Sequence, residues 1–329
     1  MHDQPIGFQS PLADLIEAFV REKRACGYKY ERAVEILRQL DRLWATSKDA
    51  LPALSQKWAE QFFKVRPGES RQGPAKRASV WRELARHARR NGLEAYIPSN
   101  HTMPLGHDSY APFIFTRPQI GAILSAFDTL PIRNWSPRRP WAMGLLFRLL
   151  YGTGMRIGEA LRLTNGDFDP QSNVLTIRQG KNRRDRIVPL APSVANRFCE
   201  YCQCYPGSDD TPVFLSPLRP RALTKTAVRS SFRCALSSAG LPPRSRGQGP
   251  RIHDLRHTFA VHRLEKWYRA GENLEAKLPI LAAYMGHTHM RETFYYLRIT
   301  GAFFPEISRR LRAFTGEIIP NPKVQGVLP

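Results

Sequence analysis

The 329-residue sequence predicts a mainly helical α+β protein with one small antiparallel sheet. Apolar residues recur at helical spacing in the first hundred residues and again after residue 116. The one clear strand pattern is a pair of β-branched segments within 174–190. Between the helical regions, residues 97–116 are rich in Pro, Gly, Ser and Asn and lack periodicity. We therefore expect an N-terminal helical domain over 1–96, a linker over 97–116, a larger domain over 117–316 and a tail over 317–329.

Four helices are expected in the N-terminal domain. Ser10 and Pro11 are typical of a helix cap and a first helical residue, and the apolar stripe that follows stops before Gly27. The other three helices are marked by apolar stripes at Val34, Leu37, Leu40 and Trp44, at Trp58, Phe62 and Phe63, and at Ala78, Trp81, Ala85 and Ala88.

The fourth of these helices also carries a row of cations with no nearby row of acids. A solvated charged face is the ordinary interpretation, and a phosphate-facing surface is the alternative. The cations are Lys76, Arg77, Arg82, Arg86, Arg89 and Arg90.

The charge of the whole chain favours a polyanionic partner. It has 50 Lys and Arg against 28 Asp and Glu, a formal net charge of +22 and a pI near 10.4. Nucleic acid is the most common partner of such a chain, whereas a basic ribosomal-type protein and an anionic-membrane binder are the alternatives. The polar N-terminus lacks an apolar signal region, and the most apolar run, 141–151, contains an arginine and is too short to span a bilayer. A cytoplasmic protein is expected.

The larger domain is expected to begin with a helix capped by Thr116. Its strands are "VLTIRQ" and "RIVPL", joined by the basic turn "GKNRRD", and helices follow to about residue 315. A cysteine cluster, "CEYCQC", could be half of a zinc site or a set of ordinary thiols. No matching Cys or His pair completes a site, and we expect no metal. The cluster comprises Cys199, Cys202 and Cys204.

Four stretches carry unusual polar residues. Each has a simpler interpretation: an ion pair, a solvated turn cation or a packed aromatic. His253 and His257 are four residues apart but lack the Glu of a zinc-protease HExxH motif. The stretches are "TGMRIGEALRL" with Arg156 and Glu159, the hairpin turn with Lys181, "HDLRHTFA" with His253, Arg256 and His257, and "MGHTHMRETFYYL" with His287, Tyr295 and Tyr296.

In this order the four stretches resemble the tyrosine recombinase (phage integrase) family, over about residues 117 to 310. The resemblance implies a site-specific DNA strand transferase that cuts and rejoins DNA through a 3′-phosphotyrosine, without a metal or nucleotide cofactor. It also implies that the N-terminal bundle is a core-binding domain that clamps DNA. Transposition, integration and other mobile-element reactions stay open, as does the need for a partner recombinase.

The resemblance implies a role for each polar residue. Arg156 and Arg256 would clamp the non-bridging oxygens of the phosphorane, which suits the bidentate guanidinium. Lys181 would be the general acid and His253 the general base. His287 would bind the phosphate, with Glu159 and His257 supporting these groups.

The nucleophile is one of two adjacent tyrosines. In the family it sits nine residues beyond the Gly-His histidine, which selects Tyr296 over Tyr295. On a helix the two side chains point about 100° apart, so they cannot both meet one phosphate without rearrangement. Only about 0.1% of a free tyrosine is phenolate at pH 7, so cations and a base must activate it.

The expected partner is double-stranded DNA with inverted half-sites, bound by a homo-oligomer, a tetramer in the family, at the nucleoid. The segment "FFPEISRRLRAF" would either cover its own domain or be exchanged with a neighbouring protomer. A type IB topoisomerase and a non-catalytic architectural or regulatory DNA-binding protein are the alternative functions.

Overall fold

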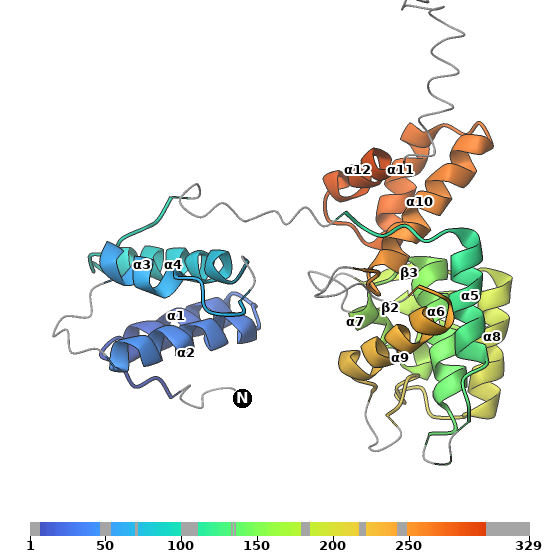
Figure 1. The fold of residues 1–329 in the computed structure, drawn as a ribbon, viewed down its shortest axis with the longest axis horizontal. Helices are drawn as coiled ribbons and strands as arrows, with labels where there is room; N and C mark the ends of the chain where they lie inside the picture. The colour runs from blue at the N-terminus through green and yellow to red at the C-terminus, as the bar shows by residue number, and fades with distance from the viewer. Residues whose placement is uncertain are drawn as a thin grey trace, which may run out of the picture. The chain divides into compact units, whose positions relative to one another are not determined.

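The computed structural model describes residues 7–46, 54–69, 72–99, 111–132, 134, 136–178, 185–216, 222–241 and 249–300, without the side chain of Arg298. The chain divides into two compact units, Met1–Ala111 and Pro112–Pro329 (Figure 1). Helices and a three-stranded antiparallel sheet make up the regular structure of the described residues. The predicted mainly helical α+β class is confirmed.

The first unit is a helical bundle around a cluster of aromatic rings. Trp81 is fully buried at its centre, with ring centroids of Trp44, Phe62 and Phe63 at 6.1, 6.2 and 5.8 Å. These large rings supply much of the apolar area that a small domain must bury. The four helices are α1 (Ala13–Ala25), α2 (Glu31–Ala45), α3 (Gln56–Phe63) and α4 (Gln72–Arg90).

The first helix begins two residues later than its sequence suggests. The backbone amides of Gln9 and Ser10 both donate to the carboxylate of Asp41, at 2.9 Å. Asp41 belongs to α2 and is 5% exposed. This contact fixes the backbone at Ser10, a turn follows at Pro11 and Leu12, and the helix begins only at Ala13, so the expected start at Pro11 is wrong.

The expected basic face of α4 is partly compensated by distant acids. Arg77 is 2% exposed, and its guanidinium binds the Glu69 carboxylate and the carbonyl oxygens of Phe62 and Lys64, the last two at 2.6 and 2.8 Å. Arg77 therefore joins α3 to α4 and does not face solvent or DNA, which corrects its assignment to that face.

The remaining cations of α4 are held less tightly. Arg90 donates to Glu22 of α1 at 2.7 Å, and Arg89 donates to the Ala95 carbonyl at 2.8 Å. Arg82 reaches the Ser99 carbonyl at 3.4 Å. Lys76 and Arg86 are exposed.

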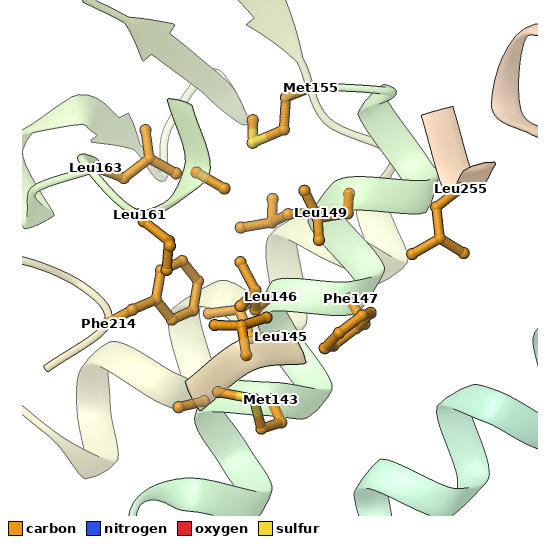
Figure 2. Close-up of a cluster of buried hydrophobic side chains, with 14 of the residues drawn as sticks. Met143, Leu145, Leu146, Phe147, Leu149, Met155, Leu161, Leu163, Phe214 and Leu255 are labelled. Atoms are coloured by element: carbon orange, nitrogen blue, oxygen red, sulfur yellow. The ribbon is translucent and has the colours of Figure 1, made fainter. Parts of the chain in front are cut away.

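The second unit is built around the apolar helix α6 (Arg139–Thr153). Figure 2 shows its side chains interleaved with Leu161, Leu163, Phe214 and Leu255 from other segments. A helix that is apolar on all sides packs at the centre of a domain. The helices of this unit are α5 (Arg117–Asp128), α6, α7 (Ile157–Ala160), η1 (Asn165–Asp167), α8 (Pro192–Cys204), α9 (Lys225–Ser238), α10 (Asp254–Arg269), α11 (Leu274–Met285) and α12 (Met290–Ile299).

The sheet has the order β1-β2-β3 and is antiparallel. The two longer strands, β2 (Val174–Ile177) and β3 (Arg186–Pro189), are the pair expected from sequence, with Leu175 opposite Val188. Strand β1 (Phe168–Asp169) is too short to leave a sequence pattern. The turn that carries Lys181 lies outside the described residues.

The end of the expected linker packs into the second unit. Phe115 is fully buried, and its amide donates to Thr258 Oγ1 of α10 at 3.1 Å. Thr116 caps α5 in a capping box with Gln119, as expected. The segment expected to form an exchanged helix, within 302–316, lies outside the described residues.

Two further expectations concern cysteines and membranes. Cys199, Cys202 and Cys204 lie on α8 as free thiols. Within the described ranges, no set of three or more His, Cys, Asp or Glu side chains is grouped to hold a metal ion. None of the helices described there is both long and apolar enough to cross a bilayer.

Candidate active site

Arg156 is fixed by the turn between α6 and α7. Helix α6 ends at Gly154 in the left-handed region, and Arg156 then forms the extended N-cap of α7. The Arg156 amide donates to Glu159 Oε2 at 2.9 Å, and Arg156 Nη1 donates to Glu159 Oε1 at 3.0 Å. The three-residue spacing seen in the sequence therefore makes one carboxylate hold both the backbone and the side chain of Arg156.

Glu159 also binds a second arginine, Arg186 of β3. Arg186 Nη1 and Nη2 donate to the two Glu159 oxygens at 3.2 and 2.8 Å. Burial raises the pKa of Glu159, but the hydrogen bonds and charges of Arg186 and Arg156 outweigh it and lower that pKa to about 2. Glu159 is therefore ionised at neutral pH.

Arg186 is a site residue that the sequence reasoning missed. The sequence pattern predicts only that it lies in a strand, "RIVPL". The strand alternation carries a usable signal, because Arg186 shares a face with buried Val188 while Ile187 between them is exposed. An arginine on the buried face of a strand needs an acidic partner.

Arg256 projects from the first turn of α10 and is 3% exposed. Its Nη1 donates to the Gly154 carbonyl at 2.6 Å, and its buried Nη2 has no hydrogen-bond partner among the described residues. Burial and the nearby charge of Arg156 lower the pKa of Arg256 to about 10, so it remains a cation at neutral pH. A buried guanidinium with an unpaired donor is suited to receive an anion.

The loop after α11 lies between Arg156 and the tyrosines. Gly286 ends α11 in the left-handed region, and its carbonyl oxygen is 3.4 Å from both Nη1 and Nη2 of Arg156. His287 follows, with its Nδ1 at 2.7 Å from Oγ1 of the buried Thr293. The His287 ring stacks on Tyr296 with centroids 5.9 Å apart.

The two tyrosines of α12 differ sharply in exposure. Tyr296 is 3% exposed and packs with Phe259 and Met285, whereas Tyr295 is 38% exposed. Burial raises the pKa of Tyr296, while the charges of Arg256 and Arg156 act in the opposite direction. The positive charges of both arginines thus favour the ionised form of the Tyr296 phenol.

Two neutral histidines of α10 complete the cluster. The His257 ring lies 4.8 Å from that of His253 and 5.6 Å from that of Tyr296. Desolvation and neighbouring positive charges lower the pKa of each histidine to about 4, although His253, unlike His257, is exposed to solvent. Both are therefore neutral at pH 7 and able to accept a proton.

The structure thus brings the expected catalytic residues together in one cluster, apart from Lys181, which lies outside the described residues. They come from four separate segments: Arg156 from the N-cap of α7, Arg256 from α10, His287 from the loop after α11 and Tyr296 from α12. Cations, neutral imidazoles and one phenol in such proximity can bind a phosphodiester and exchange protons with a reacting oxygen.

Comparison with known proteins agrees with this chemistry. The sequence model of the Phage integrase family matches residues 115–301. The protein y4rB of Sinorhizobium fredii, named as an integrase/recombinase, is 30% identical over 315 residues, covering 92% of this chain and 97% of that protein. Tyrosine recombinase XerC of Methylobacterium sp. is 28% identical over 308 residues, 88% of this chain and 89% of XerC.

Solved structures share the fold. The XerH site-specific recombinase bound to a palindromic difH substrate has a TM-score of 0.63 at 19% identity, covering 84% of this chain and 78% of XerH. A lambda integrase dimer bound to a core site has a TM-score of 0.61 at 16% identity, covering 86% of this chain and 94% of the integrase. The chain belongs to the phage integrase family and is a tyrosine site-specific recombinase.

Proposed function

We propose that this recombinase cuts and rejoins double-stranded DNA through a 3′-phosphotyrosine at Tyr296, without a metal or nucleotide. The observation that carries the proposal is the convergence of Arg156 and Arg256 on the buried phenol of Tyr296. These arginines are far apart in the sequence, and a purely structural tyrosine would have no need of two cations beside it.

The proposed step begins with the scissile phosphate bound by Arg156, Arg256 and His287. The Tyr296 oxygen attacks phosphorus, the bond from phosphorus to the 5′ oxygen breaks, and the 5′ oxygen leaves as a hydroxyl after taking a proton. Lys181 is the proposed proton donor. The covalent intermediate conserves the energy of the broken bond, so the reverse attack by a 5′ hydroxyl rejoins the strand.

The phenolic proton needs an acceptor, because about 99.9% of free tyrosine is protonated at pH 7. We assign this role to His253, with His257 packed between the rings of His253 and Tyr296. Both imidazoles are neutral at pH 7, which supports the assignment. Glu159 orients Arg156, as its two hydrogen bonds to that residue indicate.

The proposed DNA partner carries inverted half-sites, and the active species is a homo-oligomer, a tetramer by analogy with the family. The XerH neighbour bound to a palindromic difH substrate supports inverted half-sites, and the Tn1549 transposon integrase bound to a circular intermediate DNA supports double-stranded DNA as the partner. We further propose that the first unit clamps DNA through the outward cations of α4, and that the segment within 302–316 is exchanged between protomers. The cations are Lys76, Arg82, Arg86, Arg89 and Arg90.

The test is covalent adduct formation on the target DNA. The target is first obtained by sequencing DNA that copurifies covalently with the wild-type protein, and a nicked version then serves as a suicide substrate. The Tyr295→Phe protein should form the adduct, also in EDTA and without nucleotide, whereas the Tyr296→Phe protein should form none. An adduct that survives Tyr296→Phe would move the nucleophile elsewhere, and loss of the wild-type adduct in EDTA would contradict metal independence.

A further inference from the structure

Arg186 connects three segments of the site. It lies in strand β3 and contacts both the turn that carries Arg156 and the end of α11, which leads into the loop with His287. We propose that Arg186 is a positioning residue that balances the charge of Glu159, so that Arg156 keeps its positive charge for the phosphate. This inference rests on the proposed function, because it assigns Arg156 to the scissile phosphate.

The hydrogen bonds of Glu159 are fully divided between the two arginines. A carboxylate offers about four acceptor positions. Two are filled by Nη1 and Nη2 of Arg186, one by Nη1 of Arg156 and one by the backbone amide of Arg156. Because Arg186 donates to two acceptor positions of Glu159, the guanidinium of Arg156 donates to Glu159 through Nη1 alone.

The charges are divided in the same way. Two guanidiniums contact the ionised Glu159 carboxylate, and the side chains of Arg156, Arg186 and Glu159 are 23%, 11% and 2% exposed. The Glu292 side chain is 31% exposed and its carboxylate lies 4.0 Å from Arg156 Nη2, so its pull on Arg156 is weaker than that of Glu159. Without Arg186, the nearly buried carboxylate would be left to Arg156, which would be neutralised and drawn toward both oxygens. Charges act strongly at such poorly hydrated positions, so this change would weaken the pull of Arg156 on an incoming phosphate.

Arg186 also supports the loop on the other side of the site. Its Nε donates to the Tyr284 carbonyl at 3.1 Å, and the Tyr284 hydroxyl donates to the Pro189 carbonyl of β3 at 2.9 Å. A Cβ placed on Gly286 would lie 2.8 Å from Arg186 Nη1, so the loop rests directly on the guanidinium. The Gly286 carbonyl in turn faces Arg156, and His287 is the next residue. One side chain thus sets the position of both phosphate-facing groups.

The experiment separates charge balance from packing. The full-length wild type, Arg186→Lys, Arg186→Met and the double variant Arg186→Met with Glu159→Gln are compared on the suicide substrate for cleavage rate, with DNA affinity by fluorescence anisotropy and melting temperature measured in parallel. Arg186→Met should slow cleavage about 100-fold, the cost of misplacing a group in a preorganised site. Its DNA affinity should stay within about threefold, because binding is dominated by many phosphate contacts elsewhere.

The double variant gives the decisive comparison. If Arg186 acts by balancing Glu159, removing the carboxylate charge as well should restore cleavage about tenfold over Arg186→Met, a coupling typical of contacting residues. Arg186→Lys, which keeps the charge, should cleave faster than Arg186→Met. A folded Arg186→Met protein with the wild-type rate would overturn the proposal, and so would a double variant no faster than the single one.

A matched control is Arg148→Met. Arg148 of α6 also binds a carboxylate through two nitrogens, with Nη1 at 2.9 Å from Asp128 Oδ1 and Nη2 at 2.5 Å from Oδ2. Its loss should leave the cleavage rate within about twofold, as expected for an ion pair outside the site. If Arg186→Met does not fold, the test uses Arg186→Lys and the double variant, and both should cleave the substrate. If these two variants fold but do not cleave, the proposal is overturned. Failure of the proposed function is distinct, since the wild type would then form no adduct.

Discussion

Replacing Gly154 by alanine tests the link between the fold and the arginine clamp. Gly154 has φ +63°, and its carbonyl accepts the hydrogen bond from Arg256 Nη1 at 2.6 Å. An alanine Cβ at this position would lie 2.5 Å from Cδ1 of Phe259. Phe259 is 5% exposed and stacked on Tyr284 with centroids 5.7 Å apart, so its ring has little room to move.

The expected cost has two parts. The left-handed backbone costs about 1 kcal/mol for alanine relative to glycine. Overpacking against the buried ring adds about 1–3 kcal/mol. Together these predict a loss of about 2–4 kcal/mol in the free energy of unfolding, and a displaced Gly154 carbonyl should misalign Arg256 and slow adduct formation at least about tenfold.

Gly240 provides the control, since it also follows a helix and has φ +70°. Nothing in the described part of the chain lies within 4 Å of a Cβ placed there, so Gly240→Ala should cost only the backbone part, about 1 kcal/mol. Urea unfolding followed by tryptophan fluorescence and circular dichroism, fitted with two transitions for the two units, gives both values. Equal losses for the two alanine variants, or unchanged adduct formation by Gly154→Ala, would show that Gly154 does not position Arg256.

Two further predictions concern charged groups. Arg77→Ala should destabilise the first unit by about 1–3 kcal/mol, because it leaves the Phe62 and Lys64 carbonyl groups without their donor. Arg86→Ala should weaken DNA binding with little change in the urea midpoint, and the same midpoint for both variants would contradict this prediction. Acidification should destabilise the second unit in two stages, measured as the urea midpoint against pH. The pKa of His257 lies at about 4 instead of 6.5, so about 3 kcal/mol is lost as pH falls from 6.5 toward 4, and His257→Gln should reduce this loss. The pKa of Glu159 lies at about 2 instead of 4.5, so stability falls again as the pH drops from 4.5 toward 2. A urea midpoint that does not change between pH 6.5 and 4 would contradict the first stage.

Periodic and local features were predictable from the sequence. The apolar stripes of α1 to α4 lie on buried faces, and Thr116 caps α5, because both depend on residues three or four apart. The motif order also led to the residues that cluster around Tyr296. Two of the motifs include their own local support: Glu159 lies three residues from Arg156, and Thr293 lies six from His287.

Contacts between distant segments were not predictable in the same way. In the sequence Arg77 does not differ from the other five cations of α4, and only the fold places Glu69 and the carbonyl groups of Phe62 and Lys64 around it. Asp41 holds the start of α1 from 31 residues away. Arg186 reaches Glu159 across 27 residues, and no helical period connects a strand with the cap of a helix. Pairings of this kind depend on the tertiary fold.

The cations and imidazoles of the site surround the phenol of Tyr296, which should become bonded to DNA. Mass spectrometry of the trypsin-digested covalent complex tests it directly, because cleavage after Arg291 and Arg298 yields a peptide, 292–298, that contains both tyrosines. Fragment ions should assign the nucleotide mass to the second of them. A nucleotide on Tyr295, or on any residue outside this peptide, would contradict the account.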